Sequence, residues 1–257
     1  MIELSEIDRL RFGPIVAKAD IASFEDLKVA ETFCADKNVE LLIARIPAAE
    51  LPVAQALMQA GGLLTDTLFV FQRDLNPDRA ALASPPPPPD GIMLRGAKPD
   101  DAARVGEIAR VAYHGYLGHY HCDPRLDPAA CDEVYADWAS RSCTDRLVAD
   151  RTLVAELAGK IVAFMGFRIL SAEETTVTVS AVAPPGRGRN LHRLLVRHHL
   201  ARSAELGAAR MLYATQTTNL PVLRTAVRDK FELRGSYYTI HKWFDDPDRH
   251  SARRRDA

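Results

Sequence analysis

The sequence predicts a mixed α/β fold made of two halves that share an order of elements. A helix–strand–helix–strand pattern occurs once before a proline-rich segment and again at the end of the chain. Residue identity between the two copies is low, so the repeat is one of topology. Hydrophobic residues make up 47% of the 257 residues and charged residues 26%, so the chain has enough apolar material to fold around a core.

The pattern of the first half begins with a helix. Ser23 precedes Phe24, Glu25 and Asp26, and a serine followed three residues later by an acidic residue is typical of a helix start. We expect this helix to run to about Asn38. The remaining elements of this half are a buried strand over 39–46, a helix over 48–60 that ends at Gly61 and Gly62, and a strand over 64–72.

Five consecutive prolines, Pro85 to Pro89, mark the boundary between the halves. Such a run is stiff and extended, and it cannot donate hydrogen bonds to a helix or a central strand. The sequence therefore predicts a structural half-domain over 1–84, a linker over 85–91 and a complete domain over 92–245. Residues 246–257 are predicted to form a flexible polar tail.

The second half has extra elements ahead of its repeat. Pro99 followed by Asp100 and Asp101 indicates a helix start, because proline suits the first turn and acidic residues favour its positive end. The elements predicted first are a strand over 92–96, helices over 99–113 and 132–142, and strands over 151–156, 160–170 and 175–182. The repeat follows as a helix over 190–206, a strand over 210–216, a helix over 219–230 and a strand over 235–244.

Charge and cysteine usage exclude several classes of protein. The formal net charge is −1, which argues against a nucleic-acid partner held by a positive field. No apolar run reaches the ~20 residues that span a bilayer, so no membrane partner is expected. The first residues lack the basic and apolar regions of a secretory signal, so we expect a cytoplasmic protein with free thiols. The four cysteines lack the close spacing of a zinc site, so no metal is expected.

The segment that carries the chemistry is the turn between the strand over 175–182 and the following helix. Gly186, Arg187, Gly188 and Arg189 lie in this turn, and Asn190 opens the helix. The first backbone N–H groups of a helix have no partner within it, and the helix dipole adds positive charge there. Glycine lets such a backbone approach an anion, and arginine supplies charged donors. The sequence therefore indicates a phosphate site, with an ordinary basic turn as the alternative.

The residues around this turn resemble the acyl-CoA motif of the GNAT superfamily of N-acetyltransferases. The motif is carried by Val182-Ala183-Pro184, Arg187-Gly188-Arg189-Asn190-Leu191-His192 and Leu194-Leu195. Asn219 opens the next helix, as an asparagine does in that family. The resemblance implies acetyl-CoA as cosubstrate. It assigns the cofactor to Arg187, Gly188, Arg189, Asn190, Leu191, His192 and Asn219, and to the backbone of Ala181 and Val182, where two strands splay apart.

A second resemblance covers nearly the whole chain. Arg11-Phe12-Gly13 and Tyr135-Ala136-Asp137-Trp138 are similar to segments of the dTDP-fucosamine N-acetyltransferases, which have a degenerate GNAT-like half ahead of a complete GNAT domain. This resemblance implies a tandem GNAT-like fold and an amino-sugar nucleotide as acceptor. Asn190 and His192 stand where that family has glycines, and Ala226 stands where it has a tyrosine that protonates the leaving thiolate.

Transfer to an amine requires a base for the ammonium proton and an acid for the thiolate. His119, His121 and Asp123 are the candidates for the base, because the pKa of free histidine, ~6.5, suits this task. The alternative is that these residues only shape their loop. Tyr237 and Tyr238 point to opposite faces of the last strand, so at most one can face the thiol. Tyr238 is the acid candidate, with structural packing as the alternative.

These observations favour an acetyl-CoA-dependent N-acetyltransferase in which the amine attacks directly, since no activated cysteine or serine is apparent. The expected partner is a small amine acceptor, and a homodimer is a further expectation. An antibiotic, an amino acid or another small amine is an alternative to the amino-sugar nucleotide. Two other classes stay open: a non-catalytic acyl-CoA-binding module, motivated by Ala226, Asn190 and His192, and an acetyltransferase that modifies proteins.

Overall fold

A computed structural model describes residues 1–244, and the predicted tail over 246–257 lies outside the described residues. The chain forms two compact units that are interleaved in sequence. Among the described residues, unit 1 contains 1–68, 117–127 and 235–244, whereas unit 2 contains 69–116 and 128–234. None of the described helices combines the length and the apolar character that a membrane span requires.

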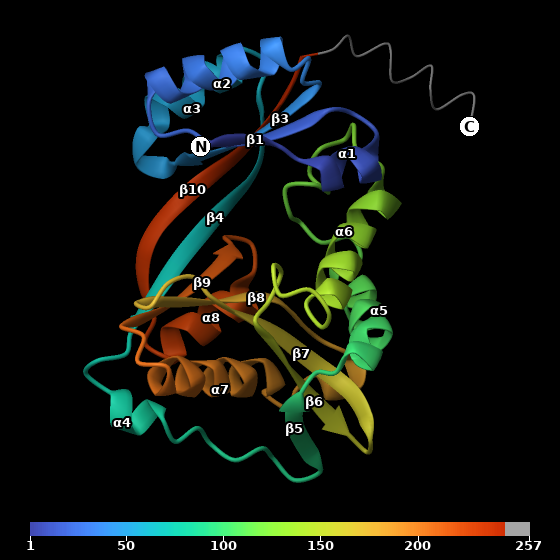
Figure 1. The fold of residues 1–257 in the computed structure, drawn as a ribbon, viewed down its shortest axis with the longest axis vertical. Coiled ribbons are helices and arrows are strands. Elements are labelled where there is room, and N and C mark those ends of the chain that lie inside the picture. The colour runs from blue at the N-terminus through green and yellow to red at the C-terminus, as the bar shows by residue number, and fades with distance from the viewer. Residues whose placement is uncertain (245–257) are drawn as a thin grey trace. The chain divides into compact units, whose positions relative to one another are not determined.

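Unit 1 is a sheet with two helices on one face (Figure 1). Its strand order is β1-β2-β3-β10-β4. Strands β2 and β3 pair in parallel, whereas the β1–β2 and β3–β10 pairs are antiparallel. The elements are β1 (Ile2–Leu4), α1 (Glu6–Phe12), β2 (Val16–Asp20), α2 (Phe24–Asp36), β3 (Leu41–Pro47), α3 (Leu51–Gln59), the start of β4 (Leu63–Asp74) and most of β10 (Glu232–Trp243).

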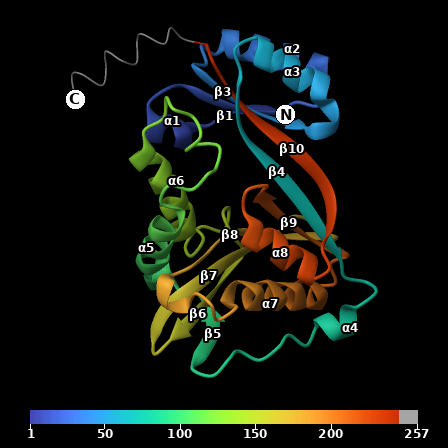
Figure 2. The same ribbon diagram turned by 180° about the vertical axis from the view of Figure 1, so that it is seen from behind.

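Side chains alternate between the two faces of the unit 1 sheet. Ala17 and Ala19 of β2, Leu42, Ala44 and Ile46 of β3 and Ile240 of β10 pack with apolar residues of α2 and α3. Figure 2 shows these two helices from behind. The opposite face carries the intervening residues, of which Lys18, Arg45, Thr239 and His241 are polar. The core therefore fixes the register of β2, β3 and β10, and this register sets which polar side chains share the second face.

Unit 2 contains the other part of the mixed sheet, in the order β4-β9-β8-β7-β6-β5. Its helices are α4 (Arg79–Leu82), α5 (Ala102–Tyr113), α6 (Pro128–Arg141), α7 (Leu191–Glu205) and α8 (Leu220–Arg228). Its strands are β5 (Ile92–Gly96), β6 (Arg151–Leu157), β7 (Lys160–Ile169), β8 (Glu174–Val182), β9 (Arg210–Gln216) and the second part of β4. Three short 3₁₀ turns cover Ala48–Glu50 of unit 1 and Pro99–Asp101 and Pro184–Gly186 of unit 2.

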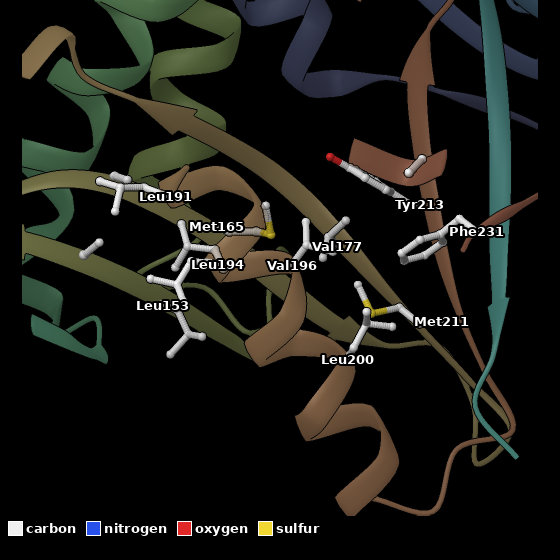
Figure 3. Packing of buried hydrophobic residues seen from close by; sticks show 14 of the residues in the cluster. Leu153, Met165, Val177, Leu191, Leu194, Val196, Leu200, Met211, Tyr213 and Phe231 are labelled. Carbon is white, nitrogen blue, oxygen red and sulfur yellow. The ribbon is translucent and has the colours of Figure 1, made fainter. Parts of the chain in front are cut away.

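Apolar layers cover both faces of the unit 2 sheet. On one face, Leu191, Leu194 and Leu200 of α7 pack against residues of β7, β8 and β9 (Figure 3). On the other face, Val105 and Ile108 of α5 pack with residues of β6, β7 and β8. A sheet covered on both sides leaves its strand ends as the places where a ligand can reach the backbone.

The predicted mixed α/β fold is confirmed, and most predicted elements lie within a few residues of their observed ends. The hydroxyl of Ser23 accepts a hydrogen bond from the backbone N–H of Asp26 at 3.1 Å, as the capping pattern predicts. The helix predicted over 132–142 begins earlier, at Pro128, because proline is well suited to the first turn. The sequence analysis did not predict β1, α1, β2 or α4.

Candidate active site

Strands β8 and β9 of unit 2 are paired only where they begin. The described parallel pairing joins Glu174 to Arg210, Thr175 to Met211 and Thr176 to Leu212. Beyond Thr176, β8 continues to Val182 without further described pairing to β9. Tyr213 is the first residue of β9 past the last pair, so it lies at the apex of a splayed pair of strands.

The register of β8 decides which backbone groups face this opening. The N–H of Ala183 donates to the carbonyl of Val162 in β7 at 2.8 Å. Because backbone groups alternate along an antiparallel ladder, those of Ala181 also point toward β7, and those of Val182 and Ser180 point toward the splayed edge. Of the two positions that the resemblance assigns to the cofactor, Val182 is therefore the one whose main chain faces the opening.

Two tyrosines at the end of α5 reach the splayed strands. The Tyr113 hydroxyl donates to the carbonyl of Ser180 at 2.8 Å, and the Tyr116 hydroxyl bonds the side-chain oxygen of Gln216 in β9. Tyr113 stacks on Tyr135 of α6 with ring centroids 4.3 Å apart. Burial raises the pKa of Tyr113, so its hydroxyl keeps its proton. Tyr135 thus takes part in an aromatic cluster that supports the opening, whereas Trp138 is exposed.

After the turn that follows β8, helix α7 begins with backbone N–H groups that have no partner within the helix. The first N–H donor within α7 is that of Leu194, which bonds the carbonyl of Asn190 at 3.1 Å. The N–H groups of Leu191, His192 and Arg193 precede it, and the Asn190 side chain makes no capping bond. These three donors and the helix dipole give the start of α7 a partial positive charge. Arg187 and Arg189 flank it on the surface, and within residues 1–244 no ion pair is seen for either.

The two glycines of this turn have different structural roles. Gly188 has φ +77°, a left-handed conformation that glycine adopts without strain, and the space beside its α-carbon is open. A Cβ at Gly186 would instead come within 3.1 Å of Leu191 and Val182, so Gly186 is needed for packing. Asn190 has φ +60°, a conformation that asparagine tolerates better than most residues.

His192, which stands where the related family has glycine, turns its side chain under the helix. Its Nε2 atom lies 2.9 Å from the hydroxyl of Tyr213. Burial lowers the pKa of His192 to about 4, so the ring is neutral near pH 7 and shares a hydrogen bond with the Tyr213 hydroxyl. The bulky side chain therefore points to the apex of the splayed strands and leaves the backbone N–H of His192 at the open helix start.

The next helix, α8, starts at Asn219 and buries Ala226. Asn219 is the N-cap residue, and its carbonyl accepts the N–H groups of Val222 and Leu223 at 3.1 Å. Ala226 is fully buried in the apolar cluster of Figure 3. Position 226 therefore offers no proton donor, and Tyr213 at the apex supplies a phenol hydroxyl in the same cluster.

In unit 1, the structure joins two of the predicted base candidates through a third residue, His241. The His119 Nδ1 atom lies 3.0 Å from His241 Nε2, and His241 Nδ1 lies 2.7 Å from an oxygen of Asp123. The same oxygen accepts the Trp243 indole N–H at 2.9 Å, and the other accepts the Arg125 backbone N–H at 2.9 Å. His241 and Asp123 are almost completely buried. The three side chains form an Asp123–His241–His119 relay.

The relay sets the protonation of each ring. Burial raises the pKa of Asp123, but the bonds from His241, Arg125 and Trp243 outweigh it and lower the pKa, so Asp123 is a carboxylate. A carboxylate requires Nδ1–H on His241, which leaves the His241 Nε2 atom to accept from Nδ1–H of His119. The free lone pair is then on Nε2 of His119. Burial lowers the pKa of His119 well below 6.5, and the positive charges of Lys18 and Arg45 lower it further.

The other catalytic candidates of the sequence, His121 and Tyr238, also belong to unit 1. His121 is half-buried in the same loop as His119. Tyr238 pairs with Ile46 in the sheet and packs against the apolar cluster under α2 and α3. Because faces alternate along β10, Tyr238 lies opposite His241 and Thr239. In residues 1–244, no group of three or more histidine, cysteine or acidic side chains could hold a metal ion, and all four cysteines are free.

Sequence reasoning missed His241 and Tyr213, which complete these two arrangements. His241 lies 118 residues from Asp123 in the chain, so no local motif connects them. The alternation Tyr237, Thr239, His241 did place a row of polar residues on one face of the last strand. Tyr213 is one aromatic residue within a predicted strand, and only the ladder ending at Thr176 shows that it lies at an apex.

Comparison with known proteins agrees with this geometry. The mixed sheet with its splayed strands is a fold that this chain shares with solved acetyltransferase structures. Residues 102–228 match the model of the Acetyltransferase (GNAT) family. No curated protein matches the chain in sequence.

Solved structures share the fold at low sequence identity. A GCN5-related N-acetyltransferase from Sphaerobacter thermophilus is 15% identical with a TM-score of 0.62, covering 95% of this chain and 76% of its own. One from Kribbella flavida is 14% identical with a TM-score of 0.58, covering 89% and 81%. A tandem GNAT protein from the clavulanic acid biosynthesis pathway is 15% identical with a TM-score of 0.60, covering 87% and 70%. The predicted tandem GNAT-like fold is confirmed.

Proposed function

We propose that this protein is an N-acetyltransferase that moves the acetyl group of acetyl-CoA to a primary amine. The observation that carries the proposal is the opening between β8 and β9, which ends at the unpaired N–H groups of α7. A pyrophosphate suits the helix start, and an extended pantetheine chain suits an unpaired strand edge. The match of residues 102–228 to the GNAT family supports the same reading.

Specific residues would hold the cofactor. The N–H groups of Leu191 and His192 would bind phosphate oxygens, and the left-handed Gly188 and Asn190 shape the turn that exposes them. Arg187 and Arg189 would add charge from the surface. Asn219 would contribute from the start of α8, and the main chain of Val182, beside Ala181, would bind the amide groups of pantetheine and the thioester oxygen.

The reaction requires proton transfers at both reacting atoms. The ammonium form of the amine loses one proton to a base, and its nitrogen then forms a bond to the thioester carbon. The carbon–sulfur bond breaks to leave the CoA thiolate, and the nitrogen gives up a second proton as the amide forms, which balances the proton that the thiolate takes up. We assign the base to His119, held in the competent tautomer by His241 and Asp123, with His121 as the second candidate. No covalent acetyl-enzyme is invoked, because the amine attacks directly.

The thiolate then needs a proton. Tyr238 is the candidate that the sequence provides, and the structure adds Tyr213, whose hydroxyl lies at the apex of the splayed strands. Burial raises the pKa of Tyr213 well above its ordinary value, so its hydroxyl is protonated at neutral pH. A hydroxyl that carries its proton at neutral pH would donate a hydrogen bond to the departing thiolate and is the proposed source of its proton.

The proposed acceptor follows from the resemblance to the dTDP-fucosamine N-acetyltransferases. An amino-sugar nucleotide is the first acceptor to test, followed by other small amines. We propose that the protein acts in the cytoplasm, since four free cysteines suit a reducing compartment. A homodimer is proposed as its assembly.

A non-catalytic acyl-CoA-binding module is the second candidate, favoured by the buried Ala226. Incubation with acetyl-CoA and a panel of amines separates the two. Release of free CoA that depends on an amine is expected for the enzyme. If calorimetry shows that acetyl-CoA binds, but no small amine or lysine peptide causes release of free CoA, the result supports the non-catalytic module. If acetyl-CoA does not bind, both the enzyme and the module are contradicted. Turnover on lysine peptides alone would indicate an acetyltransferase that modifies proteins.

A further inference from the structure

A polar cavity lies on the face of the unit 1 sheet opposite α2 and α3. It has a volume of about 310 Å³ and lies over β1, β2, β3 and β10. Two cations, two acids, a histidine and a threonine line it, namely Lys18, Arg45, Glu3, Asp20, His119 and Thr239. All of them belong to unit 1. The apolar packing on the other face fixes this register, so these side chains are held together by the fold.

One wall of the cavity contains a polar atom that lacks a partner. The hydroxyl oxygen of Thr239 is buried, with the residue only 1% exposed, and none of the described residues 1–244 bonds to it. Thr239 pairs with Arg45 in the sheet, so both side chains share this face. Buried hydroxyls nearly always have a partner, and one left unmatched at a cavity indicates a position for a ligand group.

The cavity is lined by positively and negatively charged side chains, and its two cations, Lys18 and Arg45, differ in their contacts. Lys18 is fixed by an ion pair to Asp8 at 2.6 Å and by the Tyr120 hydroxyl at 3.1 Å. The Arg45 guanidinium is exposed and forms no ion pair within the described part of the chain, which makes it the cation available to an incoming anion. Glu3 and Asp20 provide carboxylates that suit a cationic group.

His119 gives the cavity a directed acceptor. Its Nδ1 atom is engaged by His241, so Nε2 is the ring nitrogen that remains for a ligand. The Asp123 carboxylate, acting through His241, leaves a lone pair on this nitrogen. An N–H donor matches this lone pair, and a primary ammonium group is such a donor.

We propose that the unit 1 cavity binds a small primary amine that also carries an oxyanion, with the anion on Arg45 and the amine directed at His119. The inference rests on the proposed function, because it makes this ligand the acetyl acceptor. The cavity is near the lower end of ordinary ligand sites, which are about 300–1,000 Å³, so it suits a molecule of amino-acid or sugar-phosphate size. The Thr239 hydroxyl donates to the same oxyanion or accepts from the amine.

Equilibrium titration of the full chain without acetyl-CoA tests the proposal. The phosphate probes are glucosamine 6-phosphate, glucosamine and glucose 6-phosphate, and the carboxylate probes are serine, serine methyl ester and N-acetylserine. We expect the amine-plus-anion member of at least one series to bind at least tenfold more tightly than both single-group members. The series that shows this preference identifies the oxyanion. Equal affinity of the three members of both series, or no binding of either parent, overturns the proposal.

Two substitutions locate the binding in this cavity. Arg45→Gln should reduce the affinity for the preferred probe to that of its amine-only relative. Thr239→Val should weaken binding about threefold to tenfold without lowering the melting temperature, because the lost hydroxyl has no protein partner. Arg9→Ala is the control, since Arg9 is an exposed residue of α1 outside the cavity. Unchanged affinity in both cavity variants overturns the assignment.

Failure of this inference is distinguishable from failure of the proposed function. An enzyme that binds acetyl-CoA and acetylates an uncharged amine, but shows no preference for an anionic amine, retains the proposed function and loses the inference. A chain that binds the anionic amine and releases no CoA retains the cavity site and loses the transfer step.

Discussion

His119 and His241 are joined ring to ring, with Nδ1 of His119 lying 3.0 Å from Nε2 of His241. The second nitrogen of His241 lies 2.7 Å from Asp123, so the carboxylate controls a lone pair two rings away. A histidine held in one tautomer is a better base than one that divides its population between two. The loop over 117–127 thus gains its chemistry from the last strand of the chain.

Asp123→Asn should reverse the tautomers of the relay. The amide can donate to His241 Nδ1, which forces a proton onto His241 Nε2 and places the lone pair of His119 on Nδ1. We expect turnover to fall by about 10²-fold or more, the ordinary contribution of a general base. Steady-state acetylation kinetics as a function of pH measure this, and the acidic limb of the profile should move. Asp36→Asn, on the exposed end of α2, is the matched control.

A wild-type pH profile in both Asp123→Asn and His119→Ala would remove the relay from the mechanism. Retained near-ultraviolet circular dichroism in both variants is needed, because Asp123 also accepts the Trp243 indole N–H and the Arg125 backbone N–H.

Gly188→Asp should weaken acetyl-CoA binding at least tenfold, or about 1.4 kcal/mol. The new carboxylate would repel phosphate at the open start of α7, and φ +77° strains any residue with a Cβ. Gly159→Asp is a matched control, because Gly159 has φ +74° in the β6–β7 turn and equally open space. Calorimetry should show weaker binding for Gly188→Asp and Arg187→Ala only. Equal affinity of all three variants would exclude this phosphate site.

Local features of the sequence predicted local structure well. The Ser23 cap, the turn at Ala158 and Gly159 and the glycine-containing turn before α7 each depend on a few neighbouring residues. Ala158 and Gly159 adopt φ +50° and +74°, as a two-residue hairpin turn requires. The open start of α7 could be predicted because its donors are consecutive in the chain.

Long-range pairing could not be predicted in this way. Ile240 of β10 pairs with Ala44 of β3, so the end of the chain completes the sheet of the first half. This exchange brings His241 to Asp123, and no periodicity within either segment encodes a partner so distant. The three-residue strand β1 and the helix α1 are too short for a pattern to reveal.

A double-mutant cycle on His192 and Tyr213 should reveal strong coupling. Tyr213→Phe leaves the buried His192 Nε2 without its partner at 2.9 Å, and His192→Leu leaves the tyrosine hydroxyl without its acceptor. Each single variant should lose about 1–3 kcal/mol of unfolding free energy. The double variant should lose much less than the sum, since no polar atom is then left unmatched. Chemical denaturation measures the cycle, and additive losses would contradict the hydrogen bond.

Acidification should destabilise the protein before its carboxylates are titrated. Burial lowers the pKa of His192 to about 4 and of His199 to about 3, compared with 6.5 for an unfolded histidine. Below pH 6.5 the unfolded chain binds these protons and the folded chain does not, so unfolding free energy falls as pH falls. The loss continues until the pH reaches each folded pKa. Each such histidine contributes a slope of about 1.4 kcal/mol per pH unit between these limits.

His199→Gln isolates one of these contributions. The His199 Nε2 atom lies 3.1 Å from the carbonyl of Met165, and a glutamine amide can donate to the same carbonyl without titrating. Denaturant unfolding between pH 6.5 and 4.5 should therefore show a shallower dependence on pH in this variant. His114→Gln is the control, because its side chain is exposed on the surface. The carboxylates with lowered pKa, such as Asp123 and Asp101, titrate below this interval. An unchanged slope in His199→Gln would mean that His199 is protonated in the folded state.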